Sequence, residues 1–446
     1  MSRLTTILFL ALSACAGAPA ARTTAHVASP LVVPAQTGLT IIHTLTPAEG
    51  IGVRGAPVEY LDAAGGRRLA FTAGERGPNA PDPECSNTAN WQLPAHTEQC
   101  PGSIVSMKPD GSDVNVMYAF HVLDHITGQN ADGYHPYGSL ALGLDGRLHG
   151  VAQFGGVPQG GQPGETVRGA GVAFSLDPIS GSFRVDHHFF AVQRALDGEW
   201  PMGKPALLPN GSVCGTAKGG GAASGGTVWC VARGGVLRSA PMPPGSGEVY
   251  GGLTYAQGLL HGVSHTGTGG SYFVVEPQTM TLIVVGAFPA FTPPGHADDN
   301  TPIQQPLLMS DGTLFVPREF GGSHATGQLA RVSAADGIEV LRELDDILVT
   351  PVSGPRFANL TGAMPNGAIV EGCDGLLYGT ATYGGAGGFG GIYRAARDGS
   401  SLELLYSFTD ERVGYPYGGL GRGGDCALYG VTFAGSAVYR FVPPVK

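Results

Sequence analysis

The stretch Asp374–Phe408, DGLLYGTATYGGAGGFGGIYRAARDGSSLELLYSF, decides the fold of this chain. It predicts three strands, which begin at LLYG, GIYR and LELL, joined by two glycine-marked connections. A unit of this size is too small to bury a core alone, so further copies of it are expected elsewhere in the chain.

The motif LYGTATYGG recurs at six other places, with four clear copies and two weaker ones: Leu148–Gly156, Leu260–Gly270, Leu314–Gly322, Leu428–Gly435, Val213–Gly221 and Leu69–Gly74. Each copy is accompanied by a strand like GGIYRAARDG and by an apolar strand like LELLYSF. A fourth element precedes the motif and starts with Pro-x-Gly or a relative, as in Pro136–Gly143, Pro201–Leu208, Pro302–Met309 and Pro416–Gly423. The sequence therefore contains seven units of four short strands.

Seven small units in series predict an all-β fold, a seven-bladed β-propeller that spans residues 38–446. The last unit ends after Val438–Phe441, and the outer strand it lacks is found near the N-terminus at Leu39–Leu45. An N-terminal outer strand in the last blade closes the ring and leaves no exposed sheet edge. The rival architecture, an open solenoid, would leave two incomplete ends.

The motifs LYGTATYGG, GGIYRAARDG and LLYSF resemble the GloVer tandem repeat of bacterial exported proteins. The resemblance is good in Asp374–Gly435, recognisable in Tyr134–Gly181 and faint in Gly226–Gly337. The order of the strands is also similar to NHL-type propeller repeats. The resemblance implies no catalytic residue, because the family carries no catalytic motif to transfer.

The N-terminus predicts export. Arg3 precedes the apolar run Leu4–Leu12, which is too short for a permanent membrane span. The sequence Leu12-Ser13-Ala14-Cys15 matches the lipobox of bacterial lipoproteins. We therefore expect a signal peptide over residues 1–14, lipidation of Cys15 and a flexible tether over residues 15–37. The expected location is the bacterial cell envelope, as an outer membrane lipoprotein or as a periplasmic or extracellular protein. The alternative is an ordinary secretory signal in which Cys15 is incidental.

Composition limits the partners of the chain. Of 446 residues, 73 are glycine and only 13% are charged, with a net charge of −10. Such a chain lacks the basic surface that nucleic acid or anionic lipid requires. We expect a monomer that contacts a membrane only through its anchor and uses no cofactor.

Export places the remaining six cysteines in an oxidising compartment. Cys85 and Cys100 share one loop, and we expect them to pair. Cys214 and Cys230 flank the loop of a predicted hairpin and should lie opposite each other on paired strands. Cys373 and Cys426 occupy corresponding turns of successive units, where a disulfide or two free buried thiols are both possible.

The predicted topology separates two faces. Tight turns such as Asp145-Gly146 and Asp374-Gly375 lie on one face, which we name the turn face. The long insertions fall on the opposite face, the loop face: Glu75–Pro101, His121–His135, Gly155–Gly169, Ala191–Pro201, Ala287–Thr301 and Leu344–Met364. Long loops on a rigid scaffold are where binding normally resides.

Aromatic and polar residues flank the starts of the inner strands on the loop face, and we take them as candidate ligand-binding residues: Tyr134, His135, Tyr137, Trp200, Tyr415 and Tyr417. Such platforms suit sugar rings or peptides. The alternative is that the rings pack the loop crossovers. His121, His125 and His135 lie near Asp124 and Asp132, but their spacing matches no compact metal motif, and we predict no metal site there.

Three functions are compatible with these features. The first is a binding module for a glycan, a peptide or an envelope protein. The second is a propeller-type enzyme, such as a lactonase, lyase or hydrolase, with its site at the channel mouth. The third is a structural surface repeat. We favour binding and assign no catalytic residue, because the inner-strand starts offer Gly, Pro, Gln and Tyr, with Glu59 and Glu248 as exceptions.

Overall fold

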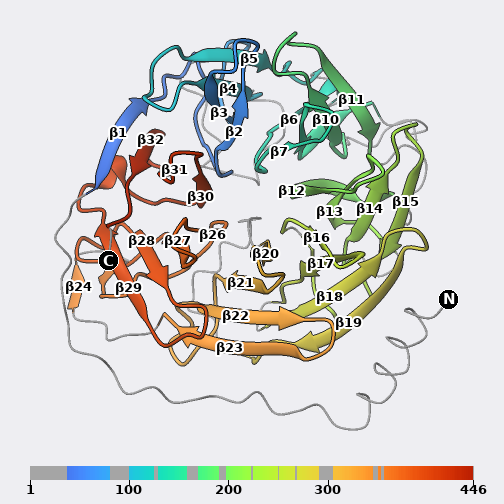
Figure 1. The fold of residues 1–446 in the computed structure, drawn as a ribbon. Coiled ribbons are helices and arrows are strands. Elements are labelled where there is room, and N and C mark those ends of the chain that lie inside the picture. Colours follow the sequence, from blue (N-terminus) through green and yellow to red (C-terminus); the bar gives the residue numbers. More distant parts are fainter. Residues whose placement is uncertain are drawn as a thin grey trace.

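The computed structural model confirms the seven-bladed propeller. It describes residues 38–80, 100–124, 129–157, 169–189, 197–221, 225–249, 251–266, 269–290, 305–344, 350–352 and 356–444. Seven four-stranded antiparallel sheets are arranged as blades around a common centre (Figure 1). Outside the strands, the described elements include one short 3₁₀ turn, η1 (Glu411–Val413).

Each blade runs from an inner strand near the centre to an outer strand at the rim. Blade 1 consists of β2 (Val58–Leu61), β3 (Arg67–Ala73), β4 (Ser103–Met107) and β5 (Asn115–Ala119). Blade 2 consists of β7 (Ala141–Leu142), β8 (Leu148–Ala152), β10 (Val172–Leu176) and β11 (Phe183–His188). Blade 3 consists of β12 (Glu199–Leu207), β13 (Val213–Gly219), β14 (Thr227–Val231) and β15 (Leu237–Pro241).

Blades 4 to 6 follow the same order. Blade 4 consists of β16 (Thr254–Ala256), β17 (Leu259–Val263), β18 (Ser271–Glu276) and β19 (Thr281–Ala287). Blade 5 consists of β20 (Leu307–Leu308), β21 (Leu314–Arg318), β22 (Gln328–Ser333) and β23 (Gly337–Glu343). Blade 6 consists of β26 (Val370–Glu371), β27 (Leu377–Ala381), β28 (Gly391–Ala395) and β29 (Leu402–Ser407).

The seventh blade closes the ring as predicted. Its inner three strands are β30 (Leu420–Arg422), β31 (Leu428–Val431) and β32 (Ala437–Phe441), and its outer strand is the N-terminal β1 (Leu39–Thr44). β1 pairs antiparallel with β32, and the two lie side by side in Figure 1 although they come from opposite ends of the sequence. The pairing gives β32 a partner on each side, so no open sheet edge remains there.

Two additional two-stranded sheets lie outside the seven blades. β6 (Asn130–Tyr134) pairs with β9 (Phe154–Gly156), and β24 (Thr350–Val352) pairs with β25 (Arg356–Ala358). The first ladder fixes the segment that leads into the inner strand of blade 2.

The repeated glycine of the second strand makes room for an aromatic ring. In blade 6, Gly379 pairs directly with Tyr393 of the third strand, and a Cβ at Gly379 would lie 2.4 Å from the Tyr393 hydroxyl oxygen. The same opposition occurs in four other blades, at Gly150 and Phe174, Gly215 and Trp229, Gly262 and Phe273, and Gly430 and Tyr439. The Leu-x-Gly motif thus recurs because each sheet buries a large ring against a residue without a side chain.

The hydrophobic core lies between neighbouring blades. One cluster joins Leu69 and Phe71 of blade 1 to Tyr429 and Val431 of blade 7. Burial between blades rather than inside one blade explains why no single unit could fold alone.

Several tight turns of the turn face follow the Asp-Gly pattern, whereas in the turn at Asp425 the next residue is Cys426, with a φ of 62°. In the turns at Asp145, Asp311, Asp374 and Asp425, the carboxylate accepts a hydrogen bond from the backbone N–H two residues later. This local bond holds the turn closed. Because the strands alternate in direction, the remaining connections emerge on the loop face.

Two of the three predicted disulfides are confirmed. Cys214 and Cys230 are directly paired across β13 and β14, with Cα atoms 4.0 Å apart. Cys373 and Cys426 join the turns of blades 6 and 7, so the alternative of free thiols is wrong. The second bond encloses 53 residues of chain, a loop for which cross-linking is worth about 4 kcal/mol. Cys85 lies outside the described residues.

The predicted signal peptide, Cys15 and the tether lie outside the described residues as well. Within the described ranges, no helix has the length and apolar character needed to cross a membrane.

Candidate functional site

Four blades begin with the same unusual backbone conformation on the loop face. The residue before the proline of the inner strand has a positive φ of 55° to 61° in four copies: His135, Trp200, Met364 and Tyr415. Non-glycine residues rarely adopt this region, and they do so only where the surroundings impose it.

Backbone hydrogen bonds show what imposes this conformation. The N–H of Tyr415 donates to the carbonyl of Phe389 in the preceding blade at 2.8 Å, and the Tyr415 carbonyl accepts from the N–H of Phe433 in its own blade at 2.9 Å. Met364 makes the equivalent bonds to Thr326 and Thr382. These residues therefore link neighbouring blades through their backbones, whatever their side chains do.

The side chains of all six predicted site residues lie on one chain of ring contacts around the channel mouth. We name this chain the aromatic belt; it consists of Phe389, Tyr415, Tyr383, Tyr417, Phe433, Arg54, Tyr137, His135, Tyr134, Phe154 and Trp200. Five members of the belt were not among the predicted site residues: Arg54, Tyr383, Phe389, Phe154 and Phe433. Tyr383, Phe154 and Phe433 end the copies LYGTATY, LHGVAQF and LYGVTF, so the repeat itself carried the signal for three of them.

Arg54 joins the two halves of the belt. Its guanidinium carbon lies 4.6 Å from the ring centre of Tyr137 and 5.0 Å from that of Phe433. On one side, Phe433 packs edge-on against Tyr417, whose hydroxyl lies 3.1 Å from that of Tyr383. A cation between two rings is attracted by both π-faces.

Burial differs along the belt. Tyr134, His135 and Tyr137 are buried, whereas the side chains of Tyr383, Tyr415, Tyr417, Phe433 and Trp200 are half-buried. Burial raises the pKa of Tyr137 well above its ordinary value, and the nearby Glu75 carboxylate raises it further. Burial also raises the pKa of Tyr417, with contributions from Tyr383 and Glu319. Both phenols are hydrogen-bond donors at neutral pH, as tyrosine ordinarily is, and the raised pKa values extend this to more alkaline pH.

A collar of glycines lies directly below the belt. A Cβ at Gly138 would lie 2.4 Å from the carbonyl oxygen of Gly203, and one at Gly203 would lie 2.5 Å from the carbonyl carbon of Gly251. Gly55 approaches Ser139 of the next blade equally closely. The glycine of the Pro-x-Gly motif thus allows the inner strands to touch backbone to backbone.

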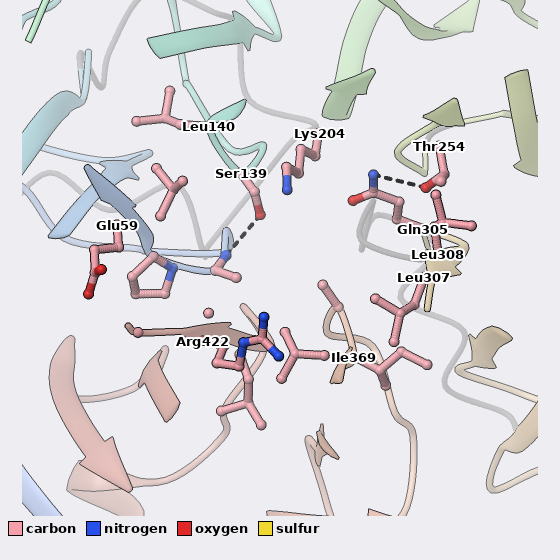
Figure 2. A pocket seen from close by; sticks show the side chains of 18 of the residues that line it. Glu59, Ser139, Leu140, Lys204, Thr254, Gln305, Leu307, Leu308, Ile369 and Arg422 are labelled. Atoms are coloured by element: carbon pink, nitrogen blue, oxygen red, sulfur yellow. Dashed lines mark hydrogen bonds between the residues drawn. The ribbon is translucent and has the colours of Figure 1, made fainter. Parts of the chain in front are cut away.

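A cavity of about 590 Å³ occupies the channel beyond the collar (Figure 2). Its lining runs from the level of Ser139, Lys204 and Gln305 to Glu59 and Arg422, next to the turns of the turn face. The cavity therefore reaches the face opposite the long loops. Polar groups and partly exposed aliphatic side chains, among them Val58, Leu307 and Val370, share its walls. The side chains of Leu140 and Ile369 pack in the core between blades.

The two acidic residues singled out from the sequence lie apart. Glu59 lines the end of the cavity near the turn face, where it lies 3.6 Å from Arg67 and accepts a hydrogen bond from the N–H of Gly424. Glu248 lies outside the inner strands and forms a bridge with His265 on the loop face, 3.7 Å from Lys218. Lys204 was missed, although PMGKPALL places a charge in an inner strand.

The predicted histidine cluster forms a local pair. His121 Nδ1 lies 2.9 Å from the carboxylate of Asp132, which also accepts from the Tyr118 hydroxyl at 2.8 Å. His135 faces the belt instead, and His125 lies outside the described residues. In the part of the chain that the structure describes, no group of three or more His, Cys, Asp or Glu is arranged to hold a metal ion.

Comparison with solved structures shows the fold alone. A streptogramin B lyase superposes with a TM-score of 0.51 and 13% identity, over 91% of this chain and 97% of that protein. Virginiamycin B lyase from Staphylococcus aureus gives a TM-score of 0.43 at 13% identity, over 70% of this chain and 85% of the lyase. The extracellular domain of a hybrid two-component system from B. thetaiotaomicron gives 0.46 at 9% identity, over 89% of this chain and 39% of that one.

No family model matches the chain. No curated protein is similar to it either. The resemblance to GloVer repeats therefore stays a prediction, and so does the alternative of an enzyme at the channel mouth.

Proposed function

We propose that this protein is an extracytoplasmic binding module that holds a glycan chain on its loop face, against the half-buried part of the aromatic belt. The observation that carries the proposal is the contact of Tyr417 with Phe433 and Tyr383, three half-buried rings from blades 6 and 7 at the channel mouth. Peptides and envelope proteins are the competing ligands.

The chemistry of these three residues favours a sugar. Aromatic faces cover the apolar face of a sugar ring, and phenol hydroxyls can bond its hydroxyl groups. The Tyr417 phenol is protonated at neutral pH, as tyrosine ordinarily is, so it can donate as well as accept. Backbone links between blades hold the rings in place, so little ordering entropy is lost on binding.

An array of bacterial envelope glycans, probed with the purified full-length chain, tests the proposal. We expect at least one glycan to bind, and Tyr417→Ala to weaken that binding about tenfold, as is typical of a central aromatic contact. Tyr406→Ala is the matched control, because Tyr406 is also half-buried but lies in the outer strand β29. Binding to peptides but to no glycan, or an unchanged affinity in Tyr417→Ala, would overturn the assignment.

The proposed location is the outer membrane, through lipid attached to Cys15. Disulfides in the described blades support export, because they persist in oxidising compartments. Labelling with a radioactive fatty acid should mark the wild-type chain and leave Cys15→Ala unmarked. Equal labelling of the two chains, or none in the wild type, would contradict lipidation at Cys15.

A further inference from the structure

The cavity beyond the glycine collar contains a ring of equivalent residues that departs from the repeat at two places. In every blade, one inner-strand residue pairs with the first residue of the Leu-x-Gly strand, as Leu142 does with Leu148. Three positions before that inner-strand residue, each blade contributes one residue to a ring around the channel. The seven members of this cavity ring are Ala56, Ser139, Lys204, Gly252, Gln305, Ala368 and Gly419. Five of the seven are small, so Lys204 and Gln305 are the long side chains that enter the channel at this level.

Lys204 carries an uncompensated charge. No hydrogen bond or ion pair engages its ammonium group in the described part of the chain. Burial lowers the pKa of Lys204, and its remaining accessible surface faces the channel. The charged residues that share the cavity lining are Glu59, which is held by Arg67 and Gly424, and Arg422, a second cation. An ammonium group with reduced hydration and no carboxylate partner favours a bound anion.

The neighbours of Lys204 supply directional hydrogen bonds. Ser139 Oγ accepts from the N–H of Ala56 at 2.8 Å, which leaves its own O–H able to donate. Gln305 is oriented by donating through Nε2 to the carbonyl of Leu253 at 2.7 Å and to Thr254 at 3.2 Å, which leaves its amide oxygen as an acceptor. Figure 2 shows Lys204 pointing into the cavity between Ser139 and Gln305, across from Arg422.

The size and walls of the cavity set the size of the ligand. A volume of about 590 Å³ falls in the range of small-molecule sites. The partly exposed aliphatic residues of the wall, such as Val58 and Leu307, favour a ligand with an apolar part beside its polar groups. Arg422, at the end near the turn face, donates to the carbonyl of Glu371 and adds positive potential where an anion would enter.

We propose that this cavity binds a small organic carboxylate, held by the Lys204 ammonium and the Ser139 hydroxyl, with Gln305 accepting from a hydroxyl or N–H of the ligand. The site is independent of the glycan-binding loop face, because the collar lies between them and the cavity reaches the opposite face.

Calorimetric titration of the full-length chain with benzoate and with its neutral analogue benzamide tests the proposal. We expect benzoate to bind about tenfold more tightly than benzamide, the value of one charge-assisted hydrogen bond. Lys204→Met should remove that preference, and Lys204→Arg should retain part of it. Lys108→Met, an exposed lysine on the turn face, is the matched control and should change neither affinity.

A second readout keeps the proposal testable if Lys204→Met fails to fold. The chain has four lysines, Lys108, Lys204, Lys218 and Lys446, so reductive methylation with ¹³C gives a small set of NMR signals. Benzoate should raise the pKa of the signal from Lys204 and leave the other three unchanged. Equal affinity for benzoate and benzamide, no binding of either, or an unchanged Lys204 signal would overturn the carboxylate site.

Discussion

The aromatic belt and the channel cavity lie one residue apart on either side of the glycine collar, yet they are built by opposite rules. In the inner strand of blade 2, Tyr137 belongs to the belt, Gly138 to the collar and Ser139 to the cavity ring. Apart from Arg54, the belt consists largely of rings that recur with the repeat, and its members already contact one another. At the level of the cavity ring, the long polar side chains come from Lys204 and Gln305, where the repeat is broken.

This difference separates architecture from function inside a repeat protein. A residue that recurs in several blades has a structural role that every blade shares, such as packing the crossover between blades. A residue found in one blade does not have such a shared structural role. By this reasoning Lys204 is stronger evidence for a ligand than any single ring of the belt, because burying its charge serves no purpose in the fold.

The largest expected effect breaks the collar that keeps the two regions apart. Gly138→Ala adds a Cβ against the backbone of Gly203, which cannot move without shifting blade 3, and we expect a loss of about 3 kcal/mol in the free energy of unfolding. The measurement is urea unfolding followed by tryptophan fluorescence. Gly234→Ala is the control, because a Cβ at Gly234 meets nothing within 4 Å. Equal stability of the two variants would mean that the collar yields and that belt and cavity form one site.

The next largest effect is expected at Tyr415, and it tests whether the main role of the belt is to stabilise the fold. Tyr415 has a φ of 60°, so both Tyr415→Ala and Tyr415→Gly lose ring packing, but glycine accepts the backbone without strain. We expect Tyr415→Ala to cost roughly 2 kcal/mol, since the ring is only half-buried, and Tyr415→Gly to cost about 1 kcal/mol less.

Tyr406 provides the control for that order of stabilities. It lies in the regular strand β29, where glycine should be worse than alanine rather than better. The same order at both positions would show that the backbone at Tyr415 is not strained and would leave the belt free to act mainly as a binding surface.

Much of this architecture could be predicted from the sequence, for a physical reason. Seven copies of a four-strand pattern report the same packing solution seven times, and the truncated end at Phe441 together with the strand at Leu39 specifies the closure. The six predicted residues of the belt could be found because they flank a recurring proline. Cys214 and Cys230 could be paired because a hairpin sets their register.

The cavity could not be predicted in the same way. Whether Lys204 points into a channel depends on the register of β12 and on how closely six other strands approach it, and neither is local in sequence. Arg54 was missed for a related reason, because its contacts with Tyr137 and Phe433 exist only after the ring has closed. Residues that occur once, and that meet their neighbours across the ring, carry no repeated signal.

The smallest expected effect concerns Lys204, the residue that distinguishes the cavity from the repeat-derived belt. Because burial lowers the pKa of Lys204 below its usual 10.5, the unfolded chain binds more protons than the folded one, and stability rises with pH between the two pKa values. Lys204→Met removes the buried charge and should stabilise the chain by roughly 1 kcal/mol at neutral pH, the lower end of the range for replacing a buried ion by an apolar residue. The gap should narrow as the pH rises toward 10.5.

Urea unfolding of the wild type and Lys204→Met at a series of pH values measures this gap directly. Lys108→Met should show no such narrowing, because the Lys108 side chain is half exposed. A gap that stays constant with pH would mean that the Lys204 ammonium is well solvated in the channel. Saturating benzoate should reverse the sign of the gap, because a ligand that binds only the folded wild type stabilises it by mass action. A stabilising substitution that becomes destabilising when an anion is present is what a binding site, and not a packing defect, predicts.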